Sequence, residues 1–134
     1  MTIKLTTEHV RMVGVFERLT RVHARDCLIN EDTVYFLIEP GKTGMVIGKN
    51  GSKIKNVCKA FGKKVKIFEY ADTPEKLTRN LIQNMNSIEI HDGVVTVYIP
   101  ASDKSTVIGK NGKNIKMIRE FLNRHFNIKN LRLK

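Results

Sequence analysis

The sequence predicts an α+β protein made of two tandem copies of one unit, each a three-stranded sheet covered by helices. The first observation is an internal repeat. A shift of 61 residues places residues 34–61 on residues 95–122 with ten identities, six of them consecutive. The second is that strand-like and helix-like segments follow one another in the same order in both copies. The third is that both copies are strongly basic. A chain of 134 residues is long enough to bury two small cores.

Each copy is expected to begin with a hairpin, because two β-branched and aromatic runs are separated by turn residues. The first copy has these strands at residues 27–29 and 33–38, and the second has them at residues 88–90 and 94–99. The turn of the second copy contains Asp92-Gly93, a dipeptide typical of tight hairpins. A third strand closes each copy, at residues 65–68 and 128–133.

Helices are expected between the second and third strands of each copy, with a glycine-containing loop between a short helix and a longer one. The short helices are expected near residues 42–47 and 103–108, with Ser102 as an N-cap, and the longer ones at Ser52–Phe61 and Lys113–Phe126. A further helix precedes each hairpin. The first spans Thr7–His23 with Thr7 as its N-cap, and the second spans Pro74–Met85 with proline in its first turn.

Two domains are therefore expected, one at residues 1–71 with an amino-terminal helix and the other at residues 72–134. The connection between them is a few residues long and contains no flexible Gly/Ser linker. We expect the two domains to pack as one rigid body.

The net charge of +11 is concentrated in the two repeats. Residues 41–70 hold eight lysines against Glu69, and residues 101–134 hold nine basic residues against Asp103 and Glu120. Each block has a net charge of +7, while the remaining residues sum to −3. Two such blocks are typical of a protein that binds a polyanion, although charge alone also fits a solvated helix face or a generally basic proteome.

Each repeat contains the segment Val-Ile-Gly-Lys-Asn-Gly between its two predicted helices. Glycines there permit positive φ and let a ligand approach the backbone, and the next helix presents unpaired N–H groups and the positive end of its dipole. A phosphate of a single strand fits against such a turn, and nearby lysines add attraction. The candidate binding residues are Ile47, Gly48, Lys49, Asn50, Gly51, Lys53 and Lys55 in the first copy, and Ile108, Gly109, Lys110, Asn111, Gly112, Lys113 and Lys116 in the second.

Apolar residues beside the loops are candidates for contact with unstacked bases. For Ile47 and Ile108 a role in lining a groove and a role in the core are both open, whereas Ile54 and Ile115 are expected in the core. Tyr35 and Tyr98 are expected to be packing residues, because no strand carries the aromatic stacking surface of an RRM.

Enzyme and cofactor sites are not indicated. The segments before Gly48-Lys49 and Gly109-Lys110 lack the first glycine of a P-loop, and asparagine follows each lysine where Ser or Thr is required. The four histidines share no metal-ligand spacing, and Cys27 and Cys58 form no Cys-x-x-Cys pair. We expect no catalysis, no metal, no cofactor and no small-molecule substrate.

No membrane association is expected either. The longest strongly apolar stretch, residues 94–99, is too short to span a bilayer, and the amino terminus lacks the apolar core of a signal peptide. We therefore expect a cytoplasmic protein.

The pattern Val-Ile-Gly-Lys-Asn-Gly, followed by isoleucine three residues on, resembles the signature of the KH domain. The order of elements is similar to that of the type II form. Two such units in succession, with Pro40-Gly41-Lys42-Thr43-Gly44-Met45 before the first loop, resemble the archaeal NusA-like transcription factor family over nearly the whole chain. The resemblance implies two tandem type II KH domains whose loops clamp the backbone of single-stranded RNA.

The same resemblance implies a role in transcription termination or antitermination, through contact with nascent RNA. RNA polymerase and the ribosome both remain open as further partners. The alternative function is a ribosome-associated or rRNA-binding KH protein, which would use the same loops on folded RNA. A long basic tail would favour that alternative, and the sequence has none.

Overall fold

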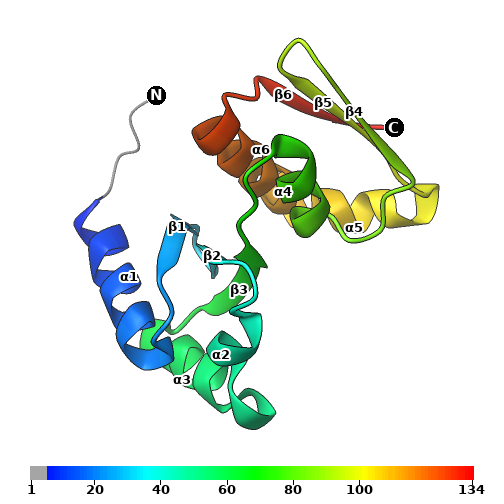
Figure 1. Cartoon of the computed structure of the whole chain (residues 1–134). Helices are drawn as coiled ribbons and strands as arrows, with labels where there is room; N and C mark the ends of the chain where they lie inside the picture. Colours follow the sequence, from blue (N-terminus) through cyan, green and yellow to red (C-terminus); the bar gives the residue numbers. More distant parts are fainter. Residues whose placement is uncertain (1–5) are drawn as a thin grey trace. The chain divides into compact units, whose positions relative to one another are not determined.

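The computed structural model describes residues 6–134, which divide into two compact units, one ending at Tyr70 and the other beginning at Ala71. Each unit has a three-stranded sheet and helices (Figure 1), so the α+β class expected from the sequence is confirmed. The first is the amino-terminal unit and the second is the carboxy-terminal unit.

The amino-terminal unit begins with a helix and a hairpin. Its elements are α1 (Thr7–Thr20), β1 (Ala24–Ile29), β2 (Thr33–Ile38), α2 (Thr43–Ile47), α3 (Ser52–Phe61) and β3 (Lys64–Glu69). Strand β2 lies in the middle of the sheet, antiparallel to β1 and parallel to β3. Because parallel strands need a crossover, α2, the glycine loop and α3 form the connection between β2 and β3.

Helices α1 and α3 pack against each other and share one core with the sheet. Phe16 of α1 stacks on Phe36 of β2 with ring centroids 4.0 Å apart, and both side chains are fully buried. Val57 of α3 is fully buried in the same cluster. Burial of each such side chain contributes about 1.5 to 3 kcal/mol, so this packing fixes where α3 begins relative to the sheet.

The carboxy-terminal unit repeats this order. Its elements are α4 (Pro74–Leu81), β4 (Ser87–His91), β5 (Val94–Tyr98), α5 (Lys104–Ile108), α6 (Lys113–Phe126) and β6 (Asn130–Leu133). Strand β5 is antiparallel to β4 and parallel to β6. Asp92 and Gly93 between β4 and β5 have φ of 51° and 77°, the two positive values that a type I′ turn requires.

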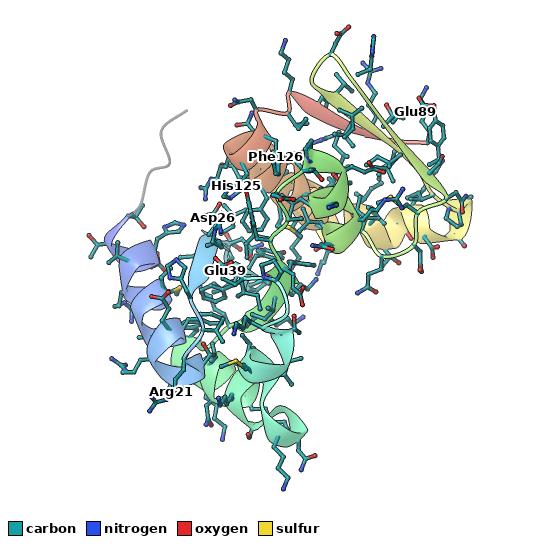
Figure 2. All side chains as sticks on the ribbon, in the orientation of Figure 1. Arg21, Asp26, Glu39, Glu89, His125 and Phe126 are labelled. Carbon is teal, nitrogen blue, oxygen red and sulfur yellow. The ribbon has the colours of Figure 1, made fainter. Side chains whose placement is uncertain are left out.

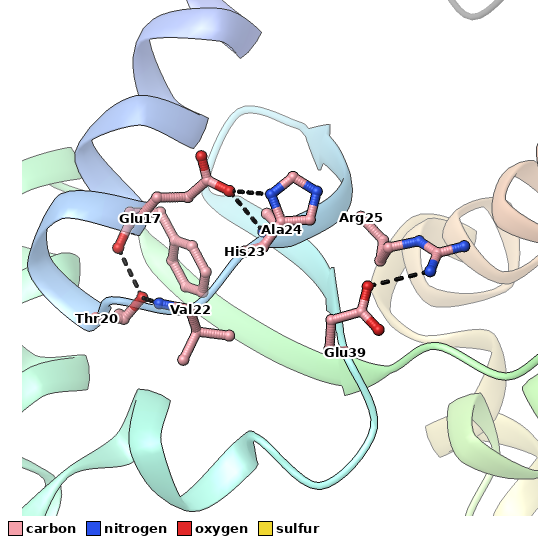
Figure 3. A network of polar contacts seen from close by, with 8 residues as sticks. Glu17, Thr20, Val22, His23, Ala24, Arg25 and Glu39 are labelled. Atoms are coloured by element: carbon pink, nitrogen blue, oxygen red, sulfur yellow. Dashed lines mark hydrogen bonds and ion pairs between the residues drawn. The ribbon is translucent and has the colours of Figure 1, made fainter.

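Several predicted helix ends were wrong. Helix α1 ends at Thr20 rather than His23, because Arg21 adopts a left-handed conformation and its N–H donates to the Glu17 carbonyl. The N-cap of α1 is Thr6 rather than Thr7, since the Thr6 hydroxyl accepts from the His9 N–H at 3.1 Å. After the helix, the Glu17 carboxylate contacts the His23 ring at 2.5 Å and accepts from the Ala24 N–H at 3.0 Å (Figure 3), which holds the start of β1 against α1.

The carboxy-terminal unit shows similar corrections. Helix α4 ends at Leu81 rather than Met85, because Ile82 is extended. A single 3₁₀ turn at Ala101–Asp103 precedes α5, and Asp103 rather than Ser102 occupies its N-cap position. The prediction of proline in the first turn of α4 is confirmed, and the Thr73 hydroxyl caps that helix by accepting from the Lys76 N–H at 3.2 Å.

Contacts of one arginine connect the three strands at one end of the first sheet. Glu39, labelled in Figures 2 and 3, follows β2 and forms an ion pair with Arg25 of β1 at 3.1 Å. The Arg25 guanidinium also lies 4.0 Å from the centroid of the Tyr70 ring. These contacts hold Tyr70, the residue after β3, close to β1.

Candidate nucleic-acid interface

Each Gly-Lys-Asn-Gly segment forms a tight loop between two helices, at residues 48–51 and 109–112. The two loops have nearly the same backbone. Gly48 has φ 75° and ψ 177°, and Gly109 has φ 77° and ψ 170°. Asn50 and Asn111 are both left-handed, with φ of 55° and 56°. Asparagine tolerates this conformation better than most residues, which explains why it fits both loops.

The loops present their middle residues to solvent. Lys49 and Asn50 are exposed, and so are Lys110 and Asn111. The following helices α3 and α6 begin directly after Gly51 and Gly112, and no side chain caps either helix. The first backbone N–H of each helix, that of Ser52 or Lys113, donates to the carbonyl of Lys49 or Lys110. The positive end of each helix dipole still faces the loop and favours an external anion such as a phosphate.

Further lysines surround each loop to different degrees. Lys55 and Lys116 are exposed on the first turns of α3 and α6, while Lys53 and Lys113 are half-buried. Lys113 already interacts within the fold. The structure thus brings the seven predicted residues of each copy together around the loop of that copy, with most of their positive charge directed to solvent.

The isoleucines before the loops are accessible. The exposed fractions of Ile47 and Ile108 are 40% and 39%, whereas Ile54 packs against the core. The open question from the sequence is therefore answered in favour of surface positions for both residues. Met45, 44% exposed on α2, adds a second apolar side chain near the first loop. Met45 could not be predicted as a site residue, because its apolar character alone does not distinguish a surface position from a core position.

The segment leading into α2 is anchored by Glu69. The Gly41 N–H donates to one Glu69 carboxylate oxygen at 3.0 Å, and the Thr43 hydroxyl donates to the other at 2.7 Å. These two hydrogen bonds, that from Gly41 first, hold the pKa of Glu69 below its usual value against the smaller opposing effect of burial. Glu69, the last residue of β3, thereby positions the start of α2, the helix that ends at Ile47 just before the first loop.

Two other structural features are absent from residues 6–134. No group of three or more His, Cys, Asp and Glu residues is arranged there to hold a metal ion. Within that same range, no helix has the length and apolar character needed to cross a membrane.

Comparisons with known proteins agree with the geometry of the loops. Residues 12–74 match the KH domain family, and residues 80–133 match the NusA-like second KH domain. Proteins named probable transcription termination protein NusA, from Methanocaldococcus jannaschii and Halobacterium salinarum, are each 32% identical to this chain. The first alignment covers 98% of this chain and 75% of the relative, and the second covers 99% of both.

A solved structure leads to the same family. The crystal structure of a protein named APE1850 has a TM-score of 0.80 and 31% identity to this chain, with 96% of this chain and 99% of that one covered. The resemblance noted in the sequence is confirmed. The chain belongs to the archaeal NusA-like family of tandem KH domain proteins.

Proposed function

We propose that the protein binds single-stranded RNA through both Gly-Lys-Asn-Gly loops and acts in transcription termination or antitermination. The observation that carries the proposal is the presence of two loops with nearly the same backbone, each exposed between two helices. The names of the relatives in Methanocaldococcus jannaschii and Halobacterium salinarum support the biological role.

The loops and the following helices would hold the RNA backbone. A phosphate placed against Gly48–Gly51 meets the positive end of the α3 dipole and the charges of Lys49 and Lys55. The same arrangement occurs at Gly109–Gly112 with Lys110 and Lys116. Neutralising phosphates with lysines releases counterions, so the affinity should fall as the salt concentration rises.

The exposed isoleucines would contact the bases. Ile47 and Ile108 precede the loops, so a base whose phosphate lies on the loop can rest against the aliphatic side chain. Such contact requires a base that is unstacked and accessible, which a duplex does not offer. We assign the protein no catalytic activity, and we propose the cytoplasm as its site of action.

Binding to single strands and duplexes tests the ligand class. Fluorescence anisotropy would compare a labelled single-stranded RNA of about twelve nucleotides with a blunt duplex of the same sequence. The single strand should bind more tightly, and its affinity should decrease between about 0.05 and 0.2 M salt. Equal affinity for the two RNAs would contradict a role for the loops in holding accessible bases.

Co-purification tests the biological partner. We propose RNA polymerase, working on nascent RNA, as the machinery with which the protein associates. The tagged protein should co-purify with RNA polymerase rather than sediment with ribosomal subunits. Sedimentation with ribosomal subunits alone would favour the rRNA-binding alternative.

A further inference from the structure

The two loops have the same four residues, but the repeat differs at the two positions that follow, where Ser52 aligns with Lys113 and the next residue differs as well. The 61-residue repeat aligns Lys53 of the first copy with Asn114 of the second. Both side chains lie over the first glycine of their loop. A Cβ atom added at Gly48 would lie 2.8 Å from Lys53 Cγ, and one added at Gly109 would lie 2.8 Å from Asn114 Cγ. Each side chain therefore packs on its loop and can influence the conformation and the charge of that loop.

Asn114 connects the two helices that flank the second loop. Its amide Nδ2 donates to the carbonyl oxygen of Thr106 in α5 at 3.1 Å, while Asn114 itself belongs to α6. The Gly109 N–H donates to the preceding carbonyl, that of Ser105, at 2.9 Å. The Asn114 amide therefore satisfies the next carbonyl group of α5, that of Thr106, at the point where the chain leaves the helix. This hydrogen bond links α5 to α6 across the loop.

Lys53 covers the first glycine of its loop in the same way, but it makes no such hydrogen bond to the preceding helix. Its aliphatic carbons cover Gly48, and its side chain is half-buried. Within residues 6–134 its ammonium group has neither an ion pair nor a hydrogen bond. A long side chain of this kind keeps its charged end in water, here beside a loop that already carries Lys49.

We propose that this position gives the two loops different ways of holding RNA. Lys53 supplies an additional phosphate contact at the first loop. Asn114 is a positioning residue that keeps the second loop and its helices in the conformation that binds. The inference rests on the proposed RNA-binding function and assigns a separate role to each copy. A loop that is already ordered loses less conformational freedom on binding, so the hydrogen bond of Asn114 can raise the affinity of the second loop without adding a charge.

Salt dependence separates a phosphate contact from a positioning role. For single strands, each phosphate contact contributes about 0.7 to the slope of the logarithm of affinity against the logarithm of salt concentration. Loss of a phosphate contact should therefore reduce the slope. Loss of a positioning residue should lower the affinity by the same factor at every salt concentration and leave the slope unchanged.

The first loop is tested in a protein whose second loop carries Lys110→Asp and Asn111→Asp. Lys53→Met keeps the aliphatic stem over Gly48 and removes the charge. Lys59→Met, at an exposed lysine two turns along α3, removes the same charge as the control. Anisotropy with single-stranded RNA of about twelve nucleotides should show a slope reduced by about 0.7 for Lys53→Met and an unchanged slope for Lys59→Met.

The second loop is tested in a protein whose first loop carries Lys49→Asp and Asn50→Asp. Asn114→Leu keeps the shape of the side chain and removes the amide donor. Affinity should fall roughly fivefold at all salt concentrations, as expected for one lost hydrogen bond, and amide hydrogen exchange of residues 110–112 should become faster. If Asn114→Leu does not fold, Asn114→Ser replaces it with the same expected results.

The outcomes distinguish this inference from the proposed function. If the unmodified protein does not bind single-stranded RNA, the proposed function is wrong and the inference fails with it. If that protein binds, but Lys53→Met behaves as Lys59→Met does, the role of Lys53 is wrong. If Asn114→Leu changes neither affinity nor exchange, the role of Asn114 is wrong, while the proposed function stands.

Discussion

The two glycines of each loop are required for different physical reasons. Gly109 combines positive φ with ψ 170°, a region that is essentially restricted to glycine, and its missing Cβ also makes room for Asn114. Gly112 has φ 74° and ψ 15°, an ordinary left-handed conformation, and the nearest atom to an added Cβ would be 3.9 Å away. The first glycine is therefore constrained by both backbone and space, and the second by backbone alone.

Substitution of these glycines by alanine should separate the two effects. Gly109→Ala should lower the free energy of unfolding by about 2 to 3 kcal/mol, and Gly112→Ala by about 1 kcal/mol. Asn111→Gly is the control, because Asn111 is already left-handed and glycine adopts that conformation readily. Urea denaturation would measure all three changes. A larger loss for Gly112→Ala than for Gly109→Ala would contradict the steric explanation.

Glu69 should make the stability of the amino-terminal unit depend on acidic pH. The hydrogen bonds from Gly41 and Thr43 place its folded-state pKa below the value of 4.5 expected in the unfolded chain. This carboxylate therefore stabilises the fold above that value, and the stabilisation is lost as the pH falls through the folded-state pKa. Glu69→Gln should lose less stability than the parent between neutral pH and the acid range, measured by thermal melting. Parallel pH profiles for the two proteins would show that the two hydrogen bonds do not favour the ionised form.

At the scale of elements, helix α1 packs against the sheet through only one of its faces. Phe16 is fully buried against Phe36 of β2, whereas Val10 on the same helix is 58% exposed. Phe16→Ala should lower the free energy of unfolding by about 3 to 5 kcal/mol, since it removes a buried ring and leaves a cavity. Val10→Ala, the matched control, should change it by less than about 0.5 kcal/mol. Similar effects of the two changes in urea denaturation would mean that α1 does not form part of the core as described.

The strands and central helices could be predicted from the sequence because their patterns are local and occur twice. The bounds of β2 (Thr33–Ile38), α3 (Ser52–Phe61) and α6 (Lys113–Phe126) agree with the prediction. The ends of α1 and α4 were missed for a different reason. The left-handed Arg21 is stabilised by its hydrogen bond to Glu17, and nothing in the residue type arginine indicates that conformation.

The candidate site was predictable as a set of residues but not in its internal differences. Residue type alone makes Lys53 and Lys113 equivalent lysines beside the loops, although the repeat aligns Lys53 with Asn114. The meaning of that difference depends on the hydrogen bond from Asn114 to Thr106, whose two partners are eight residues apart in sequence. Only the three-dimensional structure shows that the Asn114 side chain of α6 reaches a carbonyl group of α5.

At the scale of the whole molecule, the two loops belong to one chain, so under the proposed function the second contact with an RNA strand would be intramolecular. The chain passes from Tyr70 at the end of one unit to Pro74 at the start of α4 without a flexible linker. Effective concentration then raises the affinity of the two loops together above that of either alone. The prediction that the two units form one rigid body stays a prediction, and simultaneous binding requires only that one RNA strand can reach both loops.

The most direct test of this account is the RNA affinity of variants in which each loop is made acidic. Lys49→Asp with Asn50→Asp changes the first loop, and Lys110→Asp with Asn111→Asp changes the second. The side chains are exposed in both cases, so both variants should melt near the temperature of the parent. Asn56→Asp with Lys59→Asp, on exposed positions further along α3, introduces the same change of charge as a control.

Each loop variant should lose about tenfold or more in affinity for single-stranded RNA, because a negative charge stands where a phosphate must lie and the intramolecular second contact is lost. The control should stay within about threefold of the parent, since its charges lie away from the loops. Anisotropy titrations of the four folded proteins under one salt condition provide the comparison. If both loop variants bind RNA as tightly as the control, the Gly-Lys-Asn-Gly loops are not the binding site.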